Sequence, residues 1–392
     1  MTKKFSLLAV SAAVLLALGS QAHAGVGGTI TPMIGVATLP DYSVTPDIVA
    51  GDPNGTPPDS IAAHVDANVA TSAFSGVVSI NIRYSGLSYI CSGTLVNSFQ
   101  VVSAGHCVDT AASGSPFKLI DISQPYATSG NDIRVVFNSA GNTTALITAS
   151  AVVADPGYLG FGNCPAGNAP GSFCVNHDMS VITLSTAAPA SAKTYSVLST
   201  PMSGPTAITM VGYGTAGTGN VGYTVNPSFN IKRQGQNYAE YYEQDDFQFF
   251  NGGPNGVYYA DFDGPGADQN LFCNSSHAAD WGYLCGPSLA NNLESSIGGG
   301  DSGGAAFVKI NGQYVLAANN TFSGTYTGQT GGTFGTYFGG INTGSEIDFL
   351  TAATAQYGLS VVAVPEPQTY ALLALGLAGI GGLVRRRRGQ QA

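Results

Sequence analysis

The sequence predicts an all-β protein, and three observations lead to this prediction. Only 9% of the 392 residues are charged, whereas glycine (53), tyrosine (19) and phenylalanine (18) are abundant. Such a composition favours strands and turns over helices. Short apolar runs alternate with Gly, Asn, Ser and Pro, a pattern typical of a β-sandwich or β-barrel.

Several short runs between residues 76 and 318 are expected to form strands, and residues 345–357 are expected to form a short helix that begins near Asp348. Residues 225–295 have a weaker pattern, which indicates long loops around a few strands. The expected strands are 76–83, 94–103, 119–122, 133–137, 145–153, 179–184, 207–212, 304–310 and 314–318.

The N-terminus predicts export. Residues 1–24 begin with Lys3 and Lys4, continue through an apolar run and end in Ala22-His23-Ala24. A charged start, an apolar centre and a small-residue cleavage site describe a secretory signal peptide, and the run is short for a membrane span of ~20 residues. Residues 25–75, rich in Gly, Pro, Thr and Asp, are interpreted as an N-terminal arm or pro-region.

The C-terminal residues 364–392 contain Pro365-Glu366-Pro367, an apolar run and four arginines from position 385 to 388. This order resembles the PEP-CTERM sorting signal of Gram-negative bacteria. The resemblance implies processing by an exosortase-like enzyme and a cell-surface or extracellular location. Membrane contact through the terminal segments would be transient, and the arginines would stay cytoplasmic. The alternative is a permanent membrane tail.

The charge balance excludes nucleic acid as a partner. Without the two termini, which hold six of the basic residues and Glu366, the chain has 7 basic and 22 acidic residues and a net charge of −15. Such a surface repels DNA, RNA and anionic lipid.

The six cysteines fit an exported protein, because an even count in an oxidising compartment indicates disulfides. They lie in three close pairs along the chain, so local pairing is the simplest of about 15 possible connectivities. A zinc site is disfavoured because no C-x-x-C spacing occurs. The pairs are Cys91 with Cys107, Cys164 with Cys174, and Cys273 with Cys285.

Three motifs predict the chemistry. The first is Cys91-Ser92-Gly93-Thr94-Leu95, followed by Ser103-Ala104-Gly105-His106-Cys107. It resembles the trypsin-family run "C-G-G-T-L-I … W-V-L-T-A-A-H-C". The resemblance implies that His106 is the catalytic base and that a disulfide between Cys91 and Cys107 limits movement of its imidazole.

The second motif, Gly300-Asp301-Ser302-Gly303-Gly304, resembles the nucleophile motif "G-D-S-G-G-P" of the same family. The resemblance implies that Ser302 attacks the substrate and that the amide groups of Gly300 and Ser302 form the oxyanion hole. Glycine suits this turn, because no bulky side chain can enter the space where both amides point.

The third motif begins at Asp178 and continues as an alternating apolar strand, similar to the family's "D-I-A-L-L-x-L". Asp178 is therefore expected to orient His106; Asp109, only three residues from His106, is the rival and is interpreted as a solvated loop residue. Residues 208–215, which contain Gly212-Tyr213-Gly214, resemble the family's "V-x-G-W-G" strand, with Tyr213 in place of tryptophan. Together these motifs imply a trypsin-like domain at 76–360 with two six-stranded antiparallel β-barrels and the active site in the cleft between them.

Two features depart from the family. No Lys or Arg lies between Lys4 and Arg83, so cleavage after a basic residue cannot release a new N-terminal amine to pair with Asp301. Residues 48–51, Ile-Val-Ala-Gly, resemble the family's "I-V-x-G" N-terminal end but follow Asp47, and they are interpreted as a chance apolar run. Asp301 then has another partner, or another protease makes the cut. By the resemblance, Ser296 occupies the floor of the pocket that selects the substrate side chain, and an uncharged floor favours apolar or small side chains. If the alignment with the family is shifted, Glu294 would lie nearby and favour basic side chains.

The expected function is that of an exported serine endopeptidase that cuts peptides and proteins through an acyl-enzyme, with no cofactor. The alternatives are a non-catalytic surface-binding protein on the same fold and a structural component of the extracellular matrix. Asp261 and Asp263 are a weak candidate pair for Ca²⁺, but a solvated acidic loop explains them as well.

Overall fold

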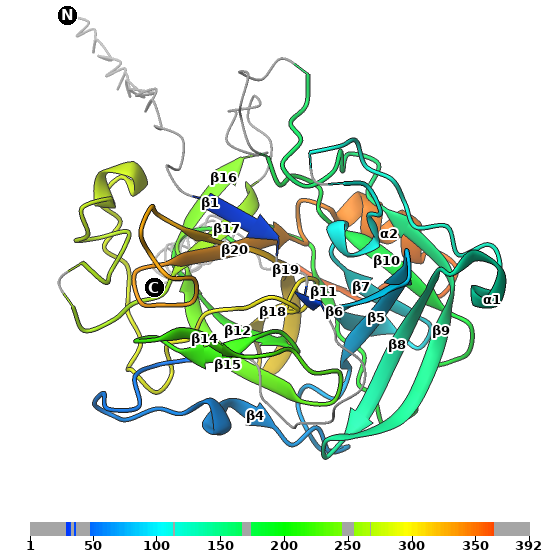
Figure 1. Cartoon of the computed structure of the whole chain (residues 1–392), viewed down its shortest axis with the longest axis horizontal. Helices are drawn as coiled ribbons and strands as arrows, with labels where there is room; N and C mark the ends of the chain where they lie inside the picture. Colours follow the sequence, from blue (N-terminus) through cyan, green and yellow to red (C-terminus); the bar gives the residue numbers. More distant parts are fainter. Residues whose placement is uncertain are drawn as a thin grey trace, which may run out of the picture.

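Two antiparallel β-sheets dominate the computed structural model, which describes residues 29–32, 35–36, 48–112, 114–166, 174–244, 255–266 and 268–363 (Figure 1). The expected signal peptide (1–24) and sorting signal (364–392) lie outside these residues. Within the described part of the chain, no helix is both long and apolar enough to cross a membrane.

The first sheet closes on itself. Its strands run in the order β6-β5-β8-β9-β10-β7, and pairing between β6 and β7 completes a six-stranded barrel, to which the short strand β2 is added. Branched apolar side chains on alternate positions fill the interior, as in Ile80, Val135 and Ile182. The bounds are β2 (Gly35–Val36), β5 (Val77–Tyr84), β6 (Leu87–Asn97), β7 (Gln100–Ser103), β8 (Asp132–Ser139), β9 (Asn142–Ala154) and β10 (Ser180–Leu184).

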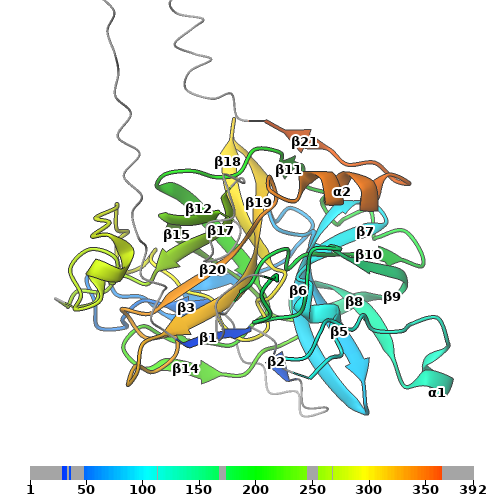
Figure 2. The ribbon, with the colours of Figure 1, turned by 90° about the horizontal axis from the view of Figure 1, so that it is seen from above.

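The second sheet has the central order β17-β20-β19-β18-β12-β15. Its two ends meet where the amide of Glu240, just after β15, donates to the carbonyl of Tyr259 in β17 at 2.9 Å. Figure 2 shows the two sheets side by side, with helix α2 (Ile347–Thr354) at one edge. The bounds are β12 (Thr206–Gly212), β15 (Lys232–Ala239), β17 (Asn255–Asp261), β18 (Ala305–Ile310), β19 (Gln313–Thr325) and β20 (Tyr337–Asn342).

Short strands extend this sheet or form a small third one. β1, β4, β11, β16 and β21 join the second sheet, and β3, β13 and β14 pair with one another. Their bounds are β1 (Thr29–Pro32), β3 (Ile48–Ala50), β4 (Val65–Asp66), β11 (Val197–Leu198), β13 (Ala216–Thr218), β14 (Gly222–Val225), β16 (Tyr241–Gln244) and β21 (Val361–Val362).

The structure confirms the predicted all-β class with two barrel-like sheets and a short C-terminal helix. Three details of the prediction are wrong. Residues 94–103 form parts of two strands, because the chain turns between β6 and β7. Residues 119–122 contribute only an isolated bridge between Leu119 and Asp109. The helix is shorter than residues 345–357.

Residues 48–51, which we interpreted as a chance apolar run, include the buried strand β3. Ile48, Val49 and Ala50 are completely buried and pair with β13 in parallel, while Val49 and Ser296 exchange two backbone hydrogen bonds of 3.2 Å. Residues 48–66, within the expected arm or pro-region, contain β3, the 3-10 turn η1 (Ile61–His64) and β4. Ile48 has φ 81°, an unusual conformation for a β-branched residue.

Candidate active site

Three side chains from distant parts of the chain meet between the two sheets. The Nε2 atom of His106 lies 2.7 Å from Oγ of Ser302, and its Nδ1 atom lies 2.6 Å from Oδ2 of Asp178. His106 is 3% exposed, and Asp178 and Ser302 are 0% exposed. The structure therefore brings together the three residues that the motifs single out, as a hydrogen-bonded chain of hydroxyl, imidazole and carboxylate.

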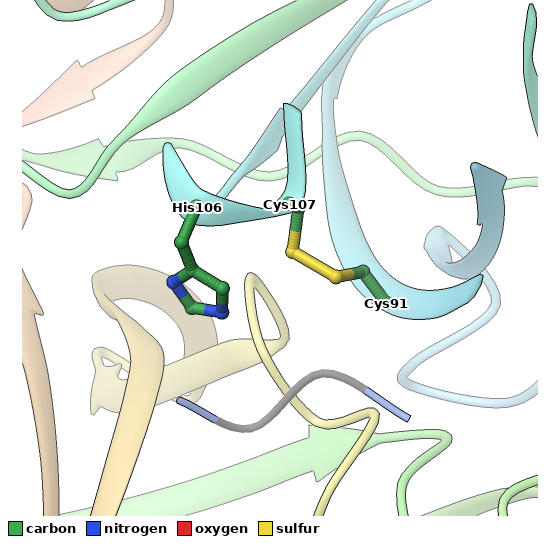
Figure 3. Close-up of side chains that lie close together, drawn as sticks. All are labelled: Cys91, His106 and Cys107. Carbon is green, nitrogen blue, oxygen red and sulfur yellow. A yellow bond between two sulfur atoms is a disulfide. The ribbon is translucent and has the colours of Figure 1, made fainter. Parts of the chain in front are cut away.

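His106 begins the 3-10 turn η2 (His106–Val108), directly after β7. The disulfide between Cys107 and Cys91 ties this turn to β6, and Figure 3 shows it beside the imidazole. The backbone amide of His106 also donates to Oδ1 of Asp178 at 2.6 Å. The residue is thus fixed at its backbone, at its neighbour and at its ring, which limits the positions that the imidazole can take.

Asp178 lies just before β10 and is held from both sides. Its carboxylate binds the ring and the amide of His106, and its carbonyl accepts a hydrogen bond from Nδ2 of Asn319 at 3.0 Å. A Cβ atom at Gly105 would lie 3.0 Å from Oδ1 of Asp178, so the chain passes close to this carboxylate. The rival Asp109 instead accepts the amides of Ala111 and Lys118 and holds its own loop; it is half-buried rather than solvated.

The loop before Ser302 is organised around the buried carboxylate of Asp301. Its Oδ1 accepts the amide of Gly214 and its Oδ2 accepts the amide of Gly298, both at 2.8 Å. Burial raises the pKa of Asp301 to about 6, although these two hydrogen bonds act in the opposite direction. Asp301 thus has backbone partners in the continuous chain, without a new N-terminal amine.

The geometry of this loop leaves two amide groups available. Gly300 has φ 109°, a conformation that favours glycine. The N–H groups of Gly300 and Ser302 donate to no acceptor within the described residues. An oxygen atom of a bound substrate could therefore accept both.

Ser92 is a residue of the candidate site that the sequence did not reveal. Its hydroxyl donates to the carbonyl of Gly300 and accepts the amide of Tyr213, both at 2.9 Å, and its own amide donates to the carbonyl of Ser302 at 2.8 Å. Ser92 thereby joins the first barrel to the loop of Ser302. The only available signal was that Ser92 stands where the family has glycine.

The two candidate pocket residues differ in their surroundings. Ser296 is 1% exposed and its Oγ has no hydrogen-bond partner in the described part of the chain, whereas its backbone pairs with Val49. Glu294 is 2% exposed, and its Oε2 accepts the amide of Leu289 at 3.0 Å. The uncharged Ser296 remains the predicted floor of the pocket.

Asp261 and Asp263 do not lie in a solvated loop, which corrects one interpretation of them. Asp261 is 1% exposed and lies near Asp263, Glu240 and Glu294; these four residues form a carboxylate cluster in which Asp263 is half-buried and the other three are buried. Burial and the repulsion between these groups raise the pKa of Asp261 and of Glu294 well above the usual range. Oxygen atoms of Glu240, Asp263 and Glu294 have no hydrogen-bond partner among the described residues.

The raised pKa of Glu240 predicts that the free energy of unfolding falls as the pH rises. Burial raises its pKa from 4.5 to about 7, so the folded chain holds a proton that the unfolded chain has released. This stabilisation is complete below about pH 4.5 and is lost as the pH rises through 7. Glu240→Gln is therefore expected to raise Tm by at least about 2 °C at pH 8.5 and to change it little at pH 5.

Differential scanning fluorimetry at the two pH values measures this effect. Replacement of the exposed Asp348 by asparagine is the matched control, for which the two pH values should give similar shifts. A stabilisation by Glu240→Gln that is equal at pH 5 and pH 8.5 would contradict the raised pKa.

Other described groups could also offer ligands to a metal. Asp155, His177 and Glu346 have ligand atoms within 4.8 Å of one another, as do Cys91, His106 and Cys107. In both groups, contacts among the residues themselves account for their proximity. Nδ1 of His177 lies 3.0 Å from Oε2 of Glu346 as an ion pair, and the two cysteines are joined in a disulfide.

The structure contains the three disulfides that local pairing predicts. Cys164 is joined to Cys174 and Cys273 to Cys285, closing short loops of 10 and 12 residues in sequence separation. The second of these loops contains the 3-10 turn η3 (Ala278–Trp281), whose Trp281 packs on Tyr241, Tyr259 and Phe272.

Comparison with known families gives two matches. Residues 66–250 match the family model of trypsin, and residues 363–388 match the model of the PEP-CTERM protein-sorting motif. The first match includes His106 and Asp178 and ends before Ser302. No curated protein matches the chain.

Proposed function

Since the chain belongs to the trypsin-like serine protease family and ends in a PEP-CTERM sorting signal, we propose that it is an exported serine endopeptidase with His106, Asp178 and Ser302 as its catalytic triad. The observation that carries the proposal is the continuous hydrogen-bonded chain from Ser302 through His106 to Asp178, with distances of 2.7 and 2.6 Å.

In acylation, His106 takes the proton from Oγ of Ser302 while Oγ attacks the carbonyl carbon of the peptide. Asp178 accepts a hydrogen bond from Nδ1, which fixes the tautomer with a free Nε2 and stabilises the imidazolium that forms. His106 then gives the proton to the leaving nitrogen atom. In deacylation the same residues act on water, so that the ester is hydrolysed and Ser302 is restored.

The oxyanion of each tetrahedral intermediate would accept hydrogen bonds from the amides of Gly300 and Ser302. These donors are fixed before the substrate arrives, because Asp301 and Ser92 hold the loop on both sides. Preorganised donors of this kind stabilise developing charge without reorganisation and contribute about 3–4 kcal/mol each in comparable sites. The neutral Ser296 supports a preference for apolar or small residues on the acyl side of the cut.

The sorting signal supports a location outside the cytoplasm. The PEP-CTERM match indicates export to the cell surface or beyond in a Gram-negative bacterium, with processing by an exosortase-type enzyme. The net charge of −15 in the part between the termini is consistent with protein substrates and not with nucleic acid.

Hydrolysis of a peptide library by the exported protein tests the proposal. Ser302→Ala is expected to lower kcat/KM by at least about 10⁴-fold, because the nucleophile is lost and the remaining binding and oxyanion groups act alone. Replacement of the exposed Ser123 by alanine is the control and should leave the rate unchanged. No cleavage by the wild type, or equal cleavage by Ser302→Ala, would favour a non-catalytic binding protein instead.

A further inference from the structure

Asp155, His177 and Glu346 form a group of possible metal ligands outside the triad, which we call the His177 cluster. One ligand atom of each residue lies within 4.8 Å of those of the other two. Nδ1 of His177 lies 3.0 Å from Oε2 of Glu346 and 3.7 Å from Oδ1 of Asp155. The cluster thus offers one imidazole nitrogen and two carboxylates in one place.

Three separate elements bring the His177 cluster together. Asp155 directly follows β9, His177 stands in the turn before β10, and Glu346 immediately precedes α2. Figure 2 shows α2 beside β10, and the two elements are in contact. An ion held by all three residues would therefore crosslink the first barrel and the C-terminal helix.

The distances within the cluster suit a small divalent ion. In a tetrahedral site with metal–ligand bonds of about 2.0–2.2 Å, neighbouring ligand atoms lie about 3.3–3.6 Å apart. The two distances from Nδ1 of His177, 3.0 and 3.7 Å, lie on either side of this range. Small shifts of the side chains would place all three ligand atoms at bonding distance from one centre.

The charges of the cluster are not balanced by the protein. Asp155 is 6% exposed and Glu346 is 5% exposed, and among the described residues neither carboxylate forms an ion pair with lysine or arginine. The contact with His177 explains why it lies beside Glu346, but even a protonated imidazole leaves one negative charge in excess when both carboxylates are ionised. A divalent cation bound to a neutral imidazole would remove this excess, and buried charges are commonly paired or bound to metals.

The ligands are held in position, and the imidazole is accessible. A Cβ atom at Gly157 would lie 2.5 Å from Cδ2 of His177, so the backbone packs closely against the ring. The amide of Gly157 donates to Oδ1 of Asp155 at 2.7 Å, and the hydroxyl of Ser345 donates to Oε1 of Glu346 at 3.3 Å. Hydrogen bonds of this kind orient metal ligands. The side chain of His177 is 34% exposed, which gives an ion a path from solvent.

We propose that the His177 cluster binds a divalent transition-metal ion, with Zn²⁺ as the best fit, through Nδ1 of His177 and one carboxylate oxygen each of Asp155 and Glu346. Zn²⁺ takes three protein ligands of this mixed kind and a water molecule, whereas Ca²⁺ and Mg²⁺ prefer oxygen ligands alone. When the ion binds, Nδ1 releases its proton to solvent and gives its lone pair to the ion.

The ion would also hold the turn that carries Asp178. The amide of Met179 donates to the carbonyl of His177 at 2.6 Å, and the amide of Asp155 donates to the carbonyl of Met179 at 2.9 Å. Metal bonds from His177 and Asp155 would close a ring of contacts around Asp178. Binding is therefore expected to stabilise the folded chain, and this inference does not depend on the proposed protease activity.

Isothermal titration calorimetry with ZnCl₂ tests the inference. The protein is the Ser302→Ala form, without a polyhistidine tag, so that the result is independent of peptide hydrolysis. One ion per chain is expected, and Ca²⁺ or Mg²⁺ should not displace it. His177→Gln, Asp155→Asn and Glu346→Gln should each weaken binding by at least about 100-fold, because loss of a ligand costs at least as much as loss of its hydrogen-bond partner.

His277→Gln is the matched control. Nδ1 of His277 lies 3.6 Å from Oδ2 of Asp280, so this is a second histidine beside an aspartate, and its side chain is 40% exposed. Its replacement should leave the affinity for Zn²⁺ unchanged. Thermal unfolding in the presence of a chelator shows whether each variant is folded.

Two further measurements on the Ser302→Ala form need no substitution in the cluster. Zn²⁺ at a free concentration of about 100 times its Kd should raise Tm by at least about 3 °C relative to chelator. The X-ray absorption spectrum of the bound zinc should show nitrogen and oxygen neighbours at about 2.0 Å and no sulfur, since all six cysteines are in disulfides.

Three outcomes would overturn the inference: no binding of Zn²⁺, binding by His177→Gln with undiminished affinity, or a spectrum with sulfur neighbours. Binding that is lost in His106→Ala but kept in His177→Gln would place the ion at the triad instead.

Discussion

Asp178→Asn is expected to lower kcat by about 10⁴-fold while the fold remains intact. Asparagine can offer its amide nitrogen to Nδ1 of His106, which would then carry no proton and leave the proton on Nε2, facing Ser302. The imidazole could not accept the proton of Oγ. Steady-state hydrolysis of a fluorogenic peptide measures the loss, and thermal unfolding shows whether the variant is folded.

Asp109→Asn is the matched control, because Asp109 is the other aspartate near His106 in sequence. Its Oδ1 accepts the amides of Ala111 and Lys118, and the amide oxygen of asparagine can accept both. The control should lose less than about tenfold in kcat. A larger loss in Asp109→Asn than in Asp178→Asn would reassign the carboxylate of the triad.

Asp301→Ala is expected to damage both stability and catalysis. Without the carboxylate, the buried amides of Gly214 and Gly298 lose their acceptor, which costs about 1–3 kcal/mol for each of them. The same loop carries the amides of Gly300 and Ser302, so kcat is expected to fall by about 10²- to 10³-fold. Urea unfolding and peptide hydrolysis measure the two effects.

The exposed Asp348 provides the comparison, since Asp348→Ala removes a carboxylate that faces solvent at the start of α2. It should change the free energy of unfolding by less than about 1 kcal/mol and should not change kcat. Normal activity in Asp301→Ala would show that Asp301 does not hold the loop of Ser302.

The candidate site could be predicted from sequence where the proposed reaction restricts which residues can stand beside the reacting side chain. His106 and Ser302 lie in motifs whose small residues and cysteine have steric or covalent reasons, and the all-β class follows from composition and short apolar runs. Asp178 was assigned chiefly by its order along the chain, and the distance of 2.6 Å to Nδ1 now supports the assignment independently.

Other features of the fold and of the candidate site depend on which strands pair. The order of residues within a short segment does not show that pairing. β1 and β2 have only four and two residues, too few for a recognisable alternation. They are strands because they pair with the segments around Phe322 and Ile90, far along the chain. The carboxylate cluster draws on three separate segments, so the sequence around Asp261 and Asp263 showed neither Glu240 nor Glu294 beside them. Ser92 is similar: its three partners become visible only when the two barrels meet.

The central claim is that Ser302 is a nucleophile activated by His106. A fluorophosphonate reagent with a reporter group, followed by peptide mass spectrometry, tests it most directly. We predict one adduct on the peptide that contains Ser302 in the wild type, with no adduct in Ser302→Ala and strongly reduced labelling in His106→Ala. No adduct in any active-site peptide, or an equal adduct in the Ser302→Ala form, would contradict the account.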